Sequence, residues 1–337
     1  PILAWLGVPA SILELAALYL SIYFSGMPFI MLYNFTAAIL RSRGDTRRPM
    51  TALISAGVIN LILNLVFVVC LHMTVDGVAF ATVISNGIGS LWLVGCLIRE
   101  EGEFRLSWNR LSIDYEIFKE ICIVGIPAGL QSVLFSVSNV MVQSAVNHLG
   151  DVYIAANTAA ASYDYVAFFI FNAFNNAALT FVSQNYAAGH LARARKCAWW
   201  ALGLAAIFGL MASMVFIHTR WSTVGMFTAD PEVQRIACIR IAILLSFGFF
   251  NGSIEVCSGI LRGFGKPLIP AFTVMTGVCG IRIILIVFMP QTAFPYEYLM
   301  STFPITWVIA FTVLAIACSR VFAQIRQKEK LQTEFVP

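Results

Sequence analysis

The sequence predicts an all-helical protein that crosses a membrane several times and is divided into two unequal lobes. Of the 337 residues, 59% are hydrophobic and only 11% are charged, and the mean hydropathy is +0.83. A soluble domain carries roughly 25% charged residues, so lipid must surround most of this surface. Nine apolar segments are long enough to span a bilayer, and a motif from the first part of the chain returns near its end.

Each predicted span is an apolar run of about 20 residues or more, the length at which a helix crosses the hydrocarbon core. Several runs are longer than about 25 residues, so these helices are expected to tilt or to extend beyond the lipid. The nine spans are residues 10–41, 49–71, 75–98, 117–146, 152–187, 193–218, 232–262, 267–289 and 298–319.

A polar stretch separates the third span from the fourth. Ten of the 22 residues from Arg99 to Glu120 are charged, more than in any other stretch of that length. We interpret residues 99–116 as a cytoplasmic link between two lobes. Residues 1–98 are then a partial N-terminal lobe of three spans, residues 117–320 are a C-terminal lobe of six spans, and residues 321–337 are a cytoplasmic tail.

The motif Leu-Arg-x-x-Gly-x4-Pro occurs once in each lobe, at residues 40–49 and again 221 residues later at residues 261–270. Each copy ends one apolar span and precedes the next. Gly44 and Gly265 are expected to permit tight turns, and the proline of each copy is expected to start the next helix. Repeats in membrane transporters mark two lobes around a central path. The unequal span counts therefore predict a transporter whose first three helices precede residue 1.

Basic residues predict the orientation, because Lys and Arg concentrate in cytoplasmic loops. Of the 21 basic residues, 17 fall in one set of alternating loops and three in the other, while Arg282 lies inside a span. The majority set includes the loops at residues 41–48, 193–196 and 262–266, together with the tail. The sequence thus predicts a multi-pass protein of the cell (plasma or inner) membrane with a cytoplasmic C-terminus.

Composition and motifs argue against several function classes. The net charge of +4 is small, so nucleic acid is not an expected partner. None of the eight cysteines forms a CxxC pair, the four histidines lack metal-ligand spacing, and no Walker A sequence is present. We therefore expect neither an enzyme nor a cofactor, and the lipid bilayer is the expected partner.

Four motifs resemble the multidrug and toxic compound extrusion (MATE) family. They occupy residues 26–49, 125–132, 178–189 and 259–266, in an order that resembles helices four, seven, eight and ten of that family. The family has twelve helices in two six-helix lobes, so the resemblance implies a MATE-like two-lobe bundle of which this chain holds about nine. It also implies a secondary active antiporter that exports small organic cations in exchange for H⁺ or Na⁺, expected to act as a monomer.

The sequence departs from the family at two positions that bear on the coupling ion. Gln131 stands where some members carry Glu in helix seven, and Asn251 stands where some carry Asp in helix ten. Both H⁺ and Na⁺ therefore stay open as coupling ions.

Charged residues inside spans are informative because each costs roughly 2.5–3.5 kcal/mol at mid-helix. Asp164 and Glu255 are predicted to be the ion-coupling carboxylates, and Asp164 is the expected position of Na⁺ if sodium is the coupling ion. Glu14 is expected to reach water at a helix end. For Arg282 two interpretations stay open: it neutralises a buried acid, or its side chain extends to the outer surface.

Polar residues at helical spacing around Asp164 predict a hydrated cavity in the C-terminal lobe. Offsets of seven, eight and eleven residues recur on one helical face. The alternative interpretation is hydrogen bonding between helices, which is common for Asn and Gln in membrane bundles. The predicted cavity residues are Gln131, Asn139, Asn157, Tyr163, Asn172, Asn175, Asn251 and Arg282.

Two other functions remain open at this point. A flippase for a lipid-linked sugar, from a related group with the same lobed plan, would need a strongly cationic cavity, for which the sequence offers Arg282. A truncated remnant that only packs or oligomerises is the second alternative.

Overall fold

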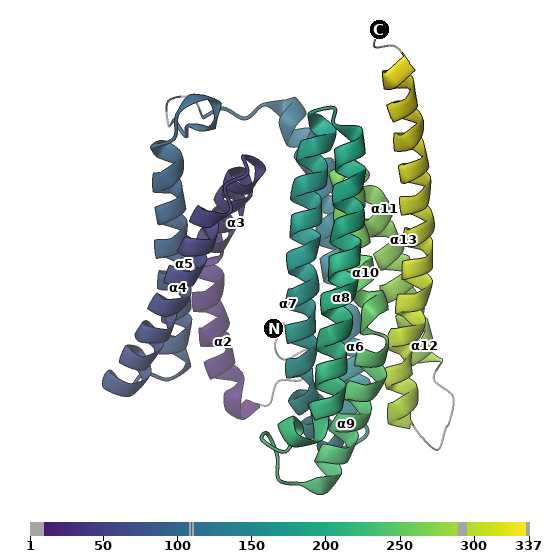
Figure 1. Cartoon of the computed structure of the whole chain (residues 1–337). Coiled ribbons are helices and arrows are strands. Elements are labelled where there is room, and N and C mark those ends of the chain that lie inside the picture. Colours follow the sequence, from purple (N-terminus) through teal and green to yellow (C-terminus); the bar gives the residue numbers. More distant parts are fainter. Residues whose placement is uncertain (1–9, 108, 110, 289–294, 335–337) are drawn as a thin grey trace. The chain divides into compact units, whose positions relative to one another are not determined.

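The computed structural model describes residues 10–107, 109, 111–288 and 295–334, and every regular element among them is a helix (Figure 1). The predicted all-helical class is confirmed for these residues. The chain divides into two compact units, Pro1–Ser112 and Ile113–Pro337. The parts of the predicted lobes, link, eighth span and tail that fall on residues 1–9, 108, 110, 289–294 and 335–337 lie outside the described residues.

The first unit is built around the helix α5, which packs against α2, α3 and α4. Its buried apolar cluster is small and consists of Ala37, Leu40, Ala52, Leu93 and Leu97. Many apolar side chains along α4 are more than half exposed, as expected for a surface that faces lipid. The elements are α2 (Ala10–Ser25), α3 (Met27–Ser42), α4 (Arg47–Leu65), the π-helical η1 (Val66–Cys70), α5 (Val75–Ile98) and the short η2 (Gly102–Phe104).

The second unit contains one large apolar core shared by its helices. Asp114 and Asp230 cap α6 and α9, because each carboxylate accepts the backbone N–H groups two and three residues ahead. The elements are α6 (Tyr115–Asn147), α7 (Asp151–Ala187), α8 (Leu191–Val224), α9 (Pro231–Ser246), α10 (Gly248–Gly263), α11 (Leu268–Thr273), the π-helical η4 (Val274–Gly280), α12 (Ile281–Val287) and α13 (Pro295–Glu334). The last helix thus continues through most of the predicted tail.

Two predicted spans are broken rather than continuous. Among the residues that the structure describes, seven helices are long and apolar enough to cross a membrane, or nine when each bent pair counts as one span. The span predicted at 10–41 bends by 41° between α2 and α3, and the span predicted at 232–262 bends by 46° between α9 and α10. Pro28 accounts for the first break because proline has no N–H to donate. The second break lies at Phe247, before Gly248.

The repeated motif forms the same turn in both units. Gly44 and Gly265 have φ values of 93° and 73°, which a residue with a Cβ adopts only under strain. In the first copy the N–H of Asp45 donates to the carbonyl of Leu40 at 3.0 Å, and in the second Lys266 donates to Leu261 at 2.8 Å. These bonds are the six-to-one pattern that ends many helices. The expectation of tight turns at both glycines is confirmed.

Close packing of α10 on α7 depends on glycines along one face of α10. A Cβ at Gly252 would lie 2.0 Å from the Phe171 ring, and one at Gly259 would lie 2.5 Å from the backbone oxygen of Asn175. Gly263 meets α7 in the same way, at 2.9 Å from the side chain of Val182. Small residues let membrane helices approach this closely, and α10 packs directly against α7.

Candidate functional site

The second unit contains a cavity of about 460 Å³, within the usual range for ligand pockets of roughly 300–1,000 Å³. Residues of α6, α7, α9, α10, α12 and α13 surround it. Aromatic and aliphatic side chains make up most of the lining. The polar members are Asn139, Gln143, Asn157, Asp164, Tyr165, Arg240, Asn251 and Arg282.

An ion pair between α7 and α9 lies in this lining. Nη2 of Arg240 is 2.5 Å from Oδ2 of Asp164, and Nη1 of Arg240 donates to the backbone carbonyl of Asn157 at 3.3 Å. The Arg240 side chain is 9% exposed and that of Asp164 is 34% exposed. The pair is therefore anchored in the core on the arginine side and accessible from the cavity on the carboxylate side.

Arg240 is a site residue that the sequence analysis missed. Arg240 is one of the three basic residues of the minority set of loops, together with Arg220 and Arg235, although it lies within the predicted span 232–262. The structure places it well inside α9 and 7% exposed. Its position in a span was the signal that could have identified it as an intramembrane charge.

Asn157 also links the ion pair to α6. Its Nδ2 donates to Oε1 of Gln143 at 2.8 Å, and Nε2 of Gln143 donates to Oδ1 of Asn147 at 2.8 Å. Gln143 is thus a further polar residue of the cavity lining. This chain of amides fixes the part of α7 that precedes Asp164 against α6.

The structure brings together five of the predicted cavity and coupling residues and places five elsewhere. Those that line the cavity are Asn139, Asn157, Asp164, Asn251 and Arg282. Gln131, Tyr163, Asn172, Asn175 and Glu255 are not among its lining residues.

Helix geometry explains why three of these residues do not line the cavity. Tyr163 precedes Asp164 by one residue, which turns its side chain about 100° around the helix. It is 5% exposed and packs edge-on against Phe216 of α8, with ring centres 5.5 Å apart. Asn172 and Asn175 lie further along α7, and Oδ1 of Asn172 accepts a hydrogen bond from Asn176 at 2.8 Å.

Glu255 belongs to a second polar cluster. Nδ2 of Asn175 on α7 donates to Oε2 of Glu255 on α10 at 3.3 Å. Asn175 is 7% exposed, and its backbone contacts Gly259 one turn beyond Glu255. The two predicted coupling carboxylates therefore have different partners: Asp164 pairs with a guanidinium and Glu255 with an amide.

The environment of Arg282 in the structure matches neither of the two interpretations that the sequence left open. Its side chain is 0% exposed, so it does not extend to an outer surface. Nη2 donates to Oγ1 of Thr306 at 3.1 Å, and the guanidinium carbon lies 4.1 Å from the centre of the Phe303 ring. No ion pair joins it to a carboxylate in the part of the chain that the structure describes. Its Nε and Nη1 atoms are buried and have no hydrogen-bond partner there.

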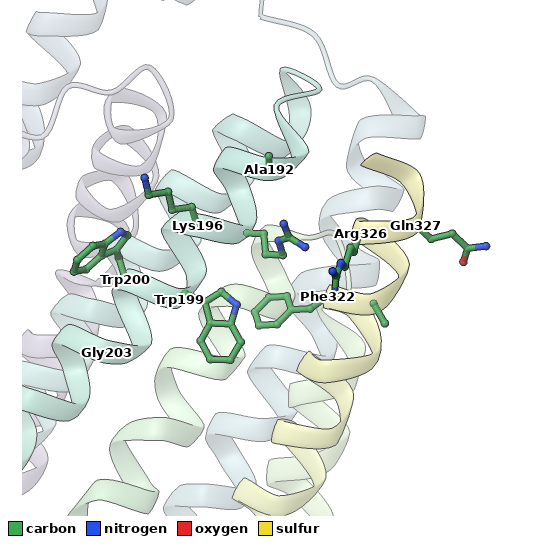
Figure 2. A pocket seen from close by; sticks show the side chains of 10 residues that line it. Ala192, Lys196, Trp199, Trp200, Gly203, Phe322, Arg326 and Gln327 are labelled. Carbon is green, nitrogen blue, oxygen red and sulfur yellow. The ribbon is translucent and has the colours of Figure 1, made fainter. Parts of the chain in front are cut away.

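A larger groove, of about 1180 Å³, lies between α8 and α13 (Figure 2). Trp199 faces Phe322 across it with ring centres 5.3 Å apart, and Arg195 pairs with Glu329 at 3.1 Å. Its Trp199 and Trp200 side chains are about 60% exposed. Exposed tryptophans beside basic residues are typical of membrane–water interfaces, so we treat the groove as interfacial surface rather than as the site.

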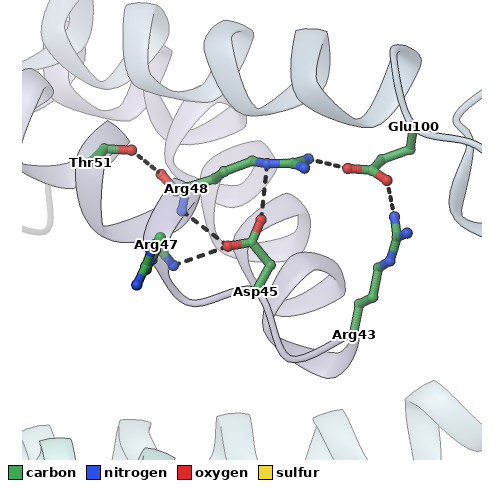
Figure 3. Close-up of polar contacts among 6 residues, drawn as sticks. All are labelled: Arg43, Asp45, Arg47, Arg48, Thr51 and Glu100. Atoms are coloured by element: carbon green, nitrogen blue, oxygen red, sulfur yellow. Dashed lines mark hydrogen bonds and ion pairs between the residues drawn. The ribbon is translucent and has the colours of Figure 1, made fainter.

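The predicted basic loop at 41–48 forms an ion-pair cluster inside the first unit. Figure 3 shows the Glu100 carboxylate between Arg43 and Arg48, with both of which it forms ion pairs. Asp45 pairs with Arg48 at 3.0 Å and accepts the backbone N–H groups that start α4. The side chain of Glu100 is 8% exposed, whereas those of the two arginines are 43% and 47% exposed. This loop therefore joins α3, α4 and the end of α5.

Replacing Glu100 by alanine is expected to destabilise the first unit by about 1–2 kcal/mol. The variant loses the charge-assisted hydrogen bonds from Arg43 and Arg48, which join the helices of this unit. The exposed arginines limit the effect, since solvent screens them. The measurement is the thermal midpoint of the purified protein in detergent. Glu101→Ala is the matched control, because Glu101 directly follows Glu100 in the sequence and is exposed. Equal midpoints for the two variants would contradict a structural role for Glu100.

The MatE family model matches residues 1–66 and 127–288. Two proteins of Bacillus subtilis (strain 168), the probable multidrug resistance proteins YoeA and YpnP, are 26% and 28% identical over 84% and 79% of this chain. The multidrug export protein MepA of Staphylococcus saprophyticus is 24% identical over 96% of it. The chain spans 62% of YoeA, 60% of YpnP and 70% of MepA.

Solved structures show the same fold. A crystal structure of MATE in the straight conformation superposes with a TM-score of 0.87 at 19% identity, covering 95% of this chain and 73% of the other. The Vibrio cholerae MATE transporter VcmN in the bent form gives a TM-score of 0.81 at 18% identity, covering 97% and 74%. At these identities the superpositions establish the architecture alone.

Proposed function

The chain belongs to the MatE family, and on that premise we propose that it works in a secondary active antiporter that exports amphipathic and cationic compounds. The observation that carries the proposal is the cavity of about 460 Å³ with its aromatic lining and its Asp164–Arg240 pair. The volume suits a drug-sized molecule. The names of the relatives, multidrug resistance and multidrug export proteins, support the same substrate class.

The proposed mechanism is alternating access, in which two lobes expose a central path to one side of the membrane and then to the other. Asp164 is the proposed coupling carboxylate. The contact with Arg240 favours H⁺ over Na⁺, because a guanidinium already occupies the position beside Oδ2 where a sodium ion would bind. A proton on the accessible side of Asp164 neutralises the carboxylate and weakens its bond to Arg240. Glu255, held by Asn175, is the proposed second acceptor.

The test is gradient-driven efflux from vesicles that contain the complete gene product. Asp164→Asn is expected to abolish efflux driven by an imposed pH gradient while leaving expression unchanged, since the amide keeps an oxygen that accepts a bond from Arg240. Glu255→Gln is expected to reduce the efflux that the pH gradient drives. The exposed Glu14→Gln is the control and should retain wild-type efflux. Full efflux by both the Asp164 and the Glu255 variants would place coupling elsewhere.

We further propose that the protein lies in the cell membrane with a cytoplasmic C-terminus, because of the asymmetry of the basic loops. A monomer stays the expected oligomeric state. In a cysteine-free variant, single cysteines at Ser42, Lys196 and Lys266 should resist an impermeant thiol reagent in intact cells. A cysteine at Thr228, in the opposite set of loops, should react. Labelling of any of the first three from outside would reverse the orientation.

A flippase for an anionic lipid-linked sugar is the second candidate, because Arg240 adds another buried base to the cavity beside Arg282. We rank it lower, since Asp164 neutralises Arg240 and leaves one uncompensated positive charge among the described lining residues. A pyrophosphate group carries several negative charges and would need more than one positive charge to balance it.

A further inference from the structure

The groove between α8 and α13 carries positive charge that the proposed coupling cycle does not use (Figure 2). Its described lining includes three bases, Arg195, Lys196 and Arg326, and no acid. Glu329 offsets Arg195, with which it pairs at 3.1 Å. Lys196 and Arg326 are exposed, and no ion pair joins either of them to a carboxylate among the described residues. Two uncompensated positive charges therefore border the groove, so it attracts an anion.

Each basic residue of the groove has an aromatic neighbour four residues away on the same helix. Residues at that spacing share one helical face, and they lie about 6 Å apart along the helix axis. The three pairs are Arg195–Trp199, Lys196–Trp200 and Arg326–Phe322. The apolar part of α8 follows residue 200 and that of α13 precedes residue 322, so both helices place the aromatic ring toward the membrane interior. The groove thus has a basic level and, about 6 Å deeper, an aromatic level.

The order of these two levels indicates the class of ligand. Both α8 and α13 are long and apolar enough to cross a membrane, so lipid molecules surround the groove. A phospholipid has its phosphate at the membrane surface and its acyl chains toward the centre, which is the same order.

The aromatic level offers an open surface to an acyl chain. Figure 2 shows Trp199 beside Phe322, and their ring centres are 5.3 Å apart. The side chain of Trp199 is about 60% exposed, so its apolar surface is accessible from the groove. A free phosphate ion would leave this surface uncovered, whereas an acyl chain covers it and removes apolar area from water.

We propose that the groove binds one anionic phospholipid of the surrounding bilayer, with the headgroup on Lys196 and Arg326 and an acyl chain along Trp199 and Phe322. Basic pockets between membrane helices hold phospholipid headgroups in this way. A zwitterionic phospholipid fits less well, because its own cationic group cancels the charge of the phosphate. The inference depends on the position of α8 and α13 in a membrane, and not on which compound or ion the protein transports.

The experiment is native mass spectrometry of the detergent-solubilised protein, titrated with phosphatidylglycerol or with phosphatidylcholine of the same acyl chains. We expect one phosphatidylglycerol molecule to bind about tenfold more tightly than phosphatidylcholine, as an attraction by two bases near the membrane surface allows. Glycerol phosphate is the third probe. It should not displace the bound phosphatidylglycerol, because it has the phosphate without an acyl chain.

Two double variants make the result specific to the groove. Lys196→Gln with Arg326→Gln removes the uncompensated charges and should lower the affinity for phosphatidylglycerol to that for phosphatidylcholine. The matched control is Arg193→Gln with Lys328→Gln, which removes two exposed charges from the same helices outside the groove lining. The control should keep the full preference. Trp200→Ser removes apolar surface and no charge, so it should weaken the binding of both lipids by the same factor.

Three results would overturn the inference. The first is equal binding of the two lipids by the wild-type protein, and the second is displacement of the lipid by glycerol phosphate. The third is an equal loss of preference in both double variants, which would mean that the overall surface charge attracts the lipid. A loss confined to phosphatidylglycerol in Trp200→Ser would contradict the acyl-chain contact. Efflux in the vesicle assay is scored separately, so any of these results leaves the proposed function standing.

Discussion

Replacing Asp164 by leucine is expected to lower the stability of the second unit by about 3–5 kcal/mol, the cost of leaving a buried ion without its partner. The affected ion is Arg240, whose side chain is 9% exposed. Arg240→Met should cost less, because the carboxylate that it leaves behind is 34% exposed and can be solvated from the cavity. The measurement is the thermal midpoint of each purified variant in detergent.

The double variant Asp164→Leu with Arg240→Met separates an ion-pair effect from a packing effect. Two apolar side chains in place of a buried pair are commonly neutral for folding, so the double variant should regain most of the loss. Arg235→Met controls for removing an arginine from α9, because Arg235 is exposed. A double variant as unstable as Asp164→Leu would contradict the unpaired Arg240 charge as the cause of the loss and would point to packing instead.

The second large effect is expected at Gly259. An alanine there places its Cβ 2.5 Å from the backbone oxygen of Asn175, so α10 must move away from α7. Overpacking of this kind costs about 1–3 kcal/mol. It should also weaken the bond between Asn175 and Glu255, which lies one turn from Gly259 on α10.

Gly203 is the matched control, because a Cβ there meets nothing within 4 Å. Gly203→Ala should be neutral or stabilise α8 by about 0.5–1 kcal/mol, the usual gain from replacing a helical glycine. Both variants are compared by thermal midpoint. If Gly259→Ala were as stable as Gly203→Ala, the close approach of α10 to α7 would be wrong.

Hydropathy predicted the position of most helices because each helix must match the thickness of the bilayer. The span predicted at 75–98 coincides with Val75–Ile98, and the one at 152–187 differs by one residue from Asp151–Ala187. The break at Phe247 was missed because apolar residues continue across it. Hydropathy records burial in lipid and carries no information on the direction of the helix axis.

The site was harder to predict, because its contacts join residues far apart in the chain. Asp164 was identified from the cost of a charge inside a span, but its partner lies 76 residues away on another helix. Spacing along α7 gave Asn157 correctly as a neighbour on the cavity side. The same spacing also selected Asn172 and Asn175, which lie about 12–16 Å further along the helix and beyond the cavity.

The bend between α9 and α10 turns a small angular change into a large displacement. Gly248, directly after the bend, lines the cavity, while Arg240 precedes the bend and Glu255 follows it. The 16 residues of α10 extend about 24 Å from this point. Opening or closing the 46° angle by about 10° therefore moves the far end of α10 by about 4 Å. A change of the bend beside the cavity would therefore also displace the Gly265 turn, which follows the far end of α10.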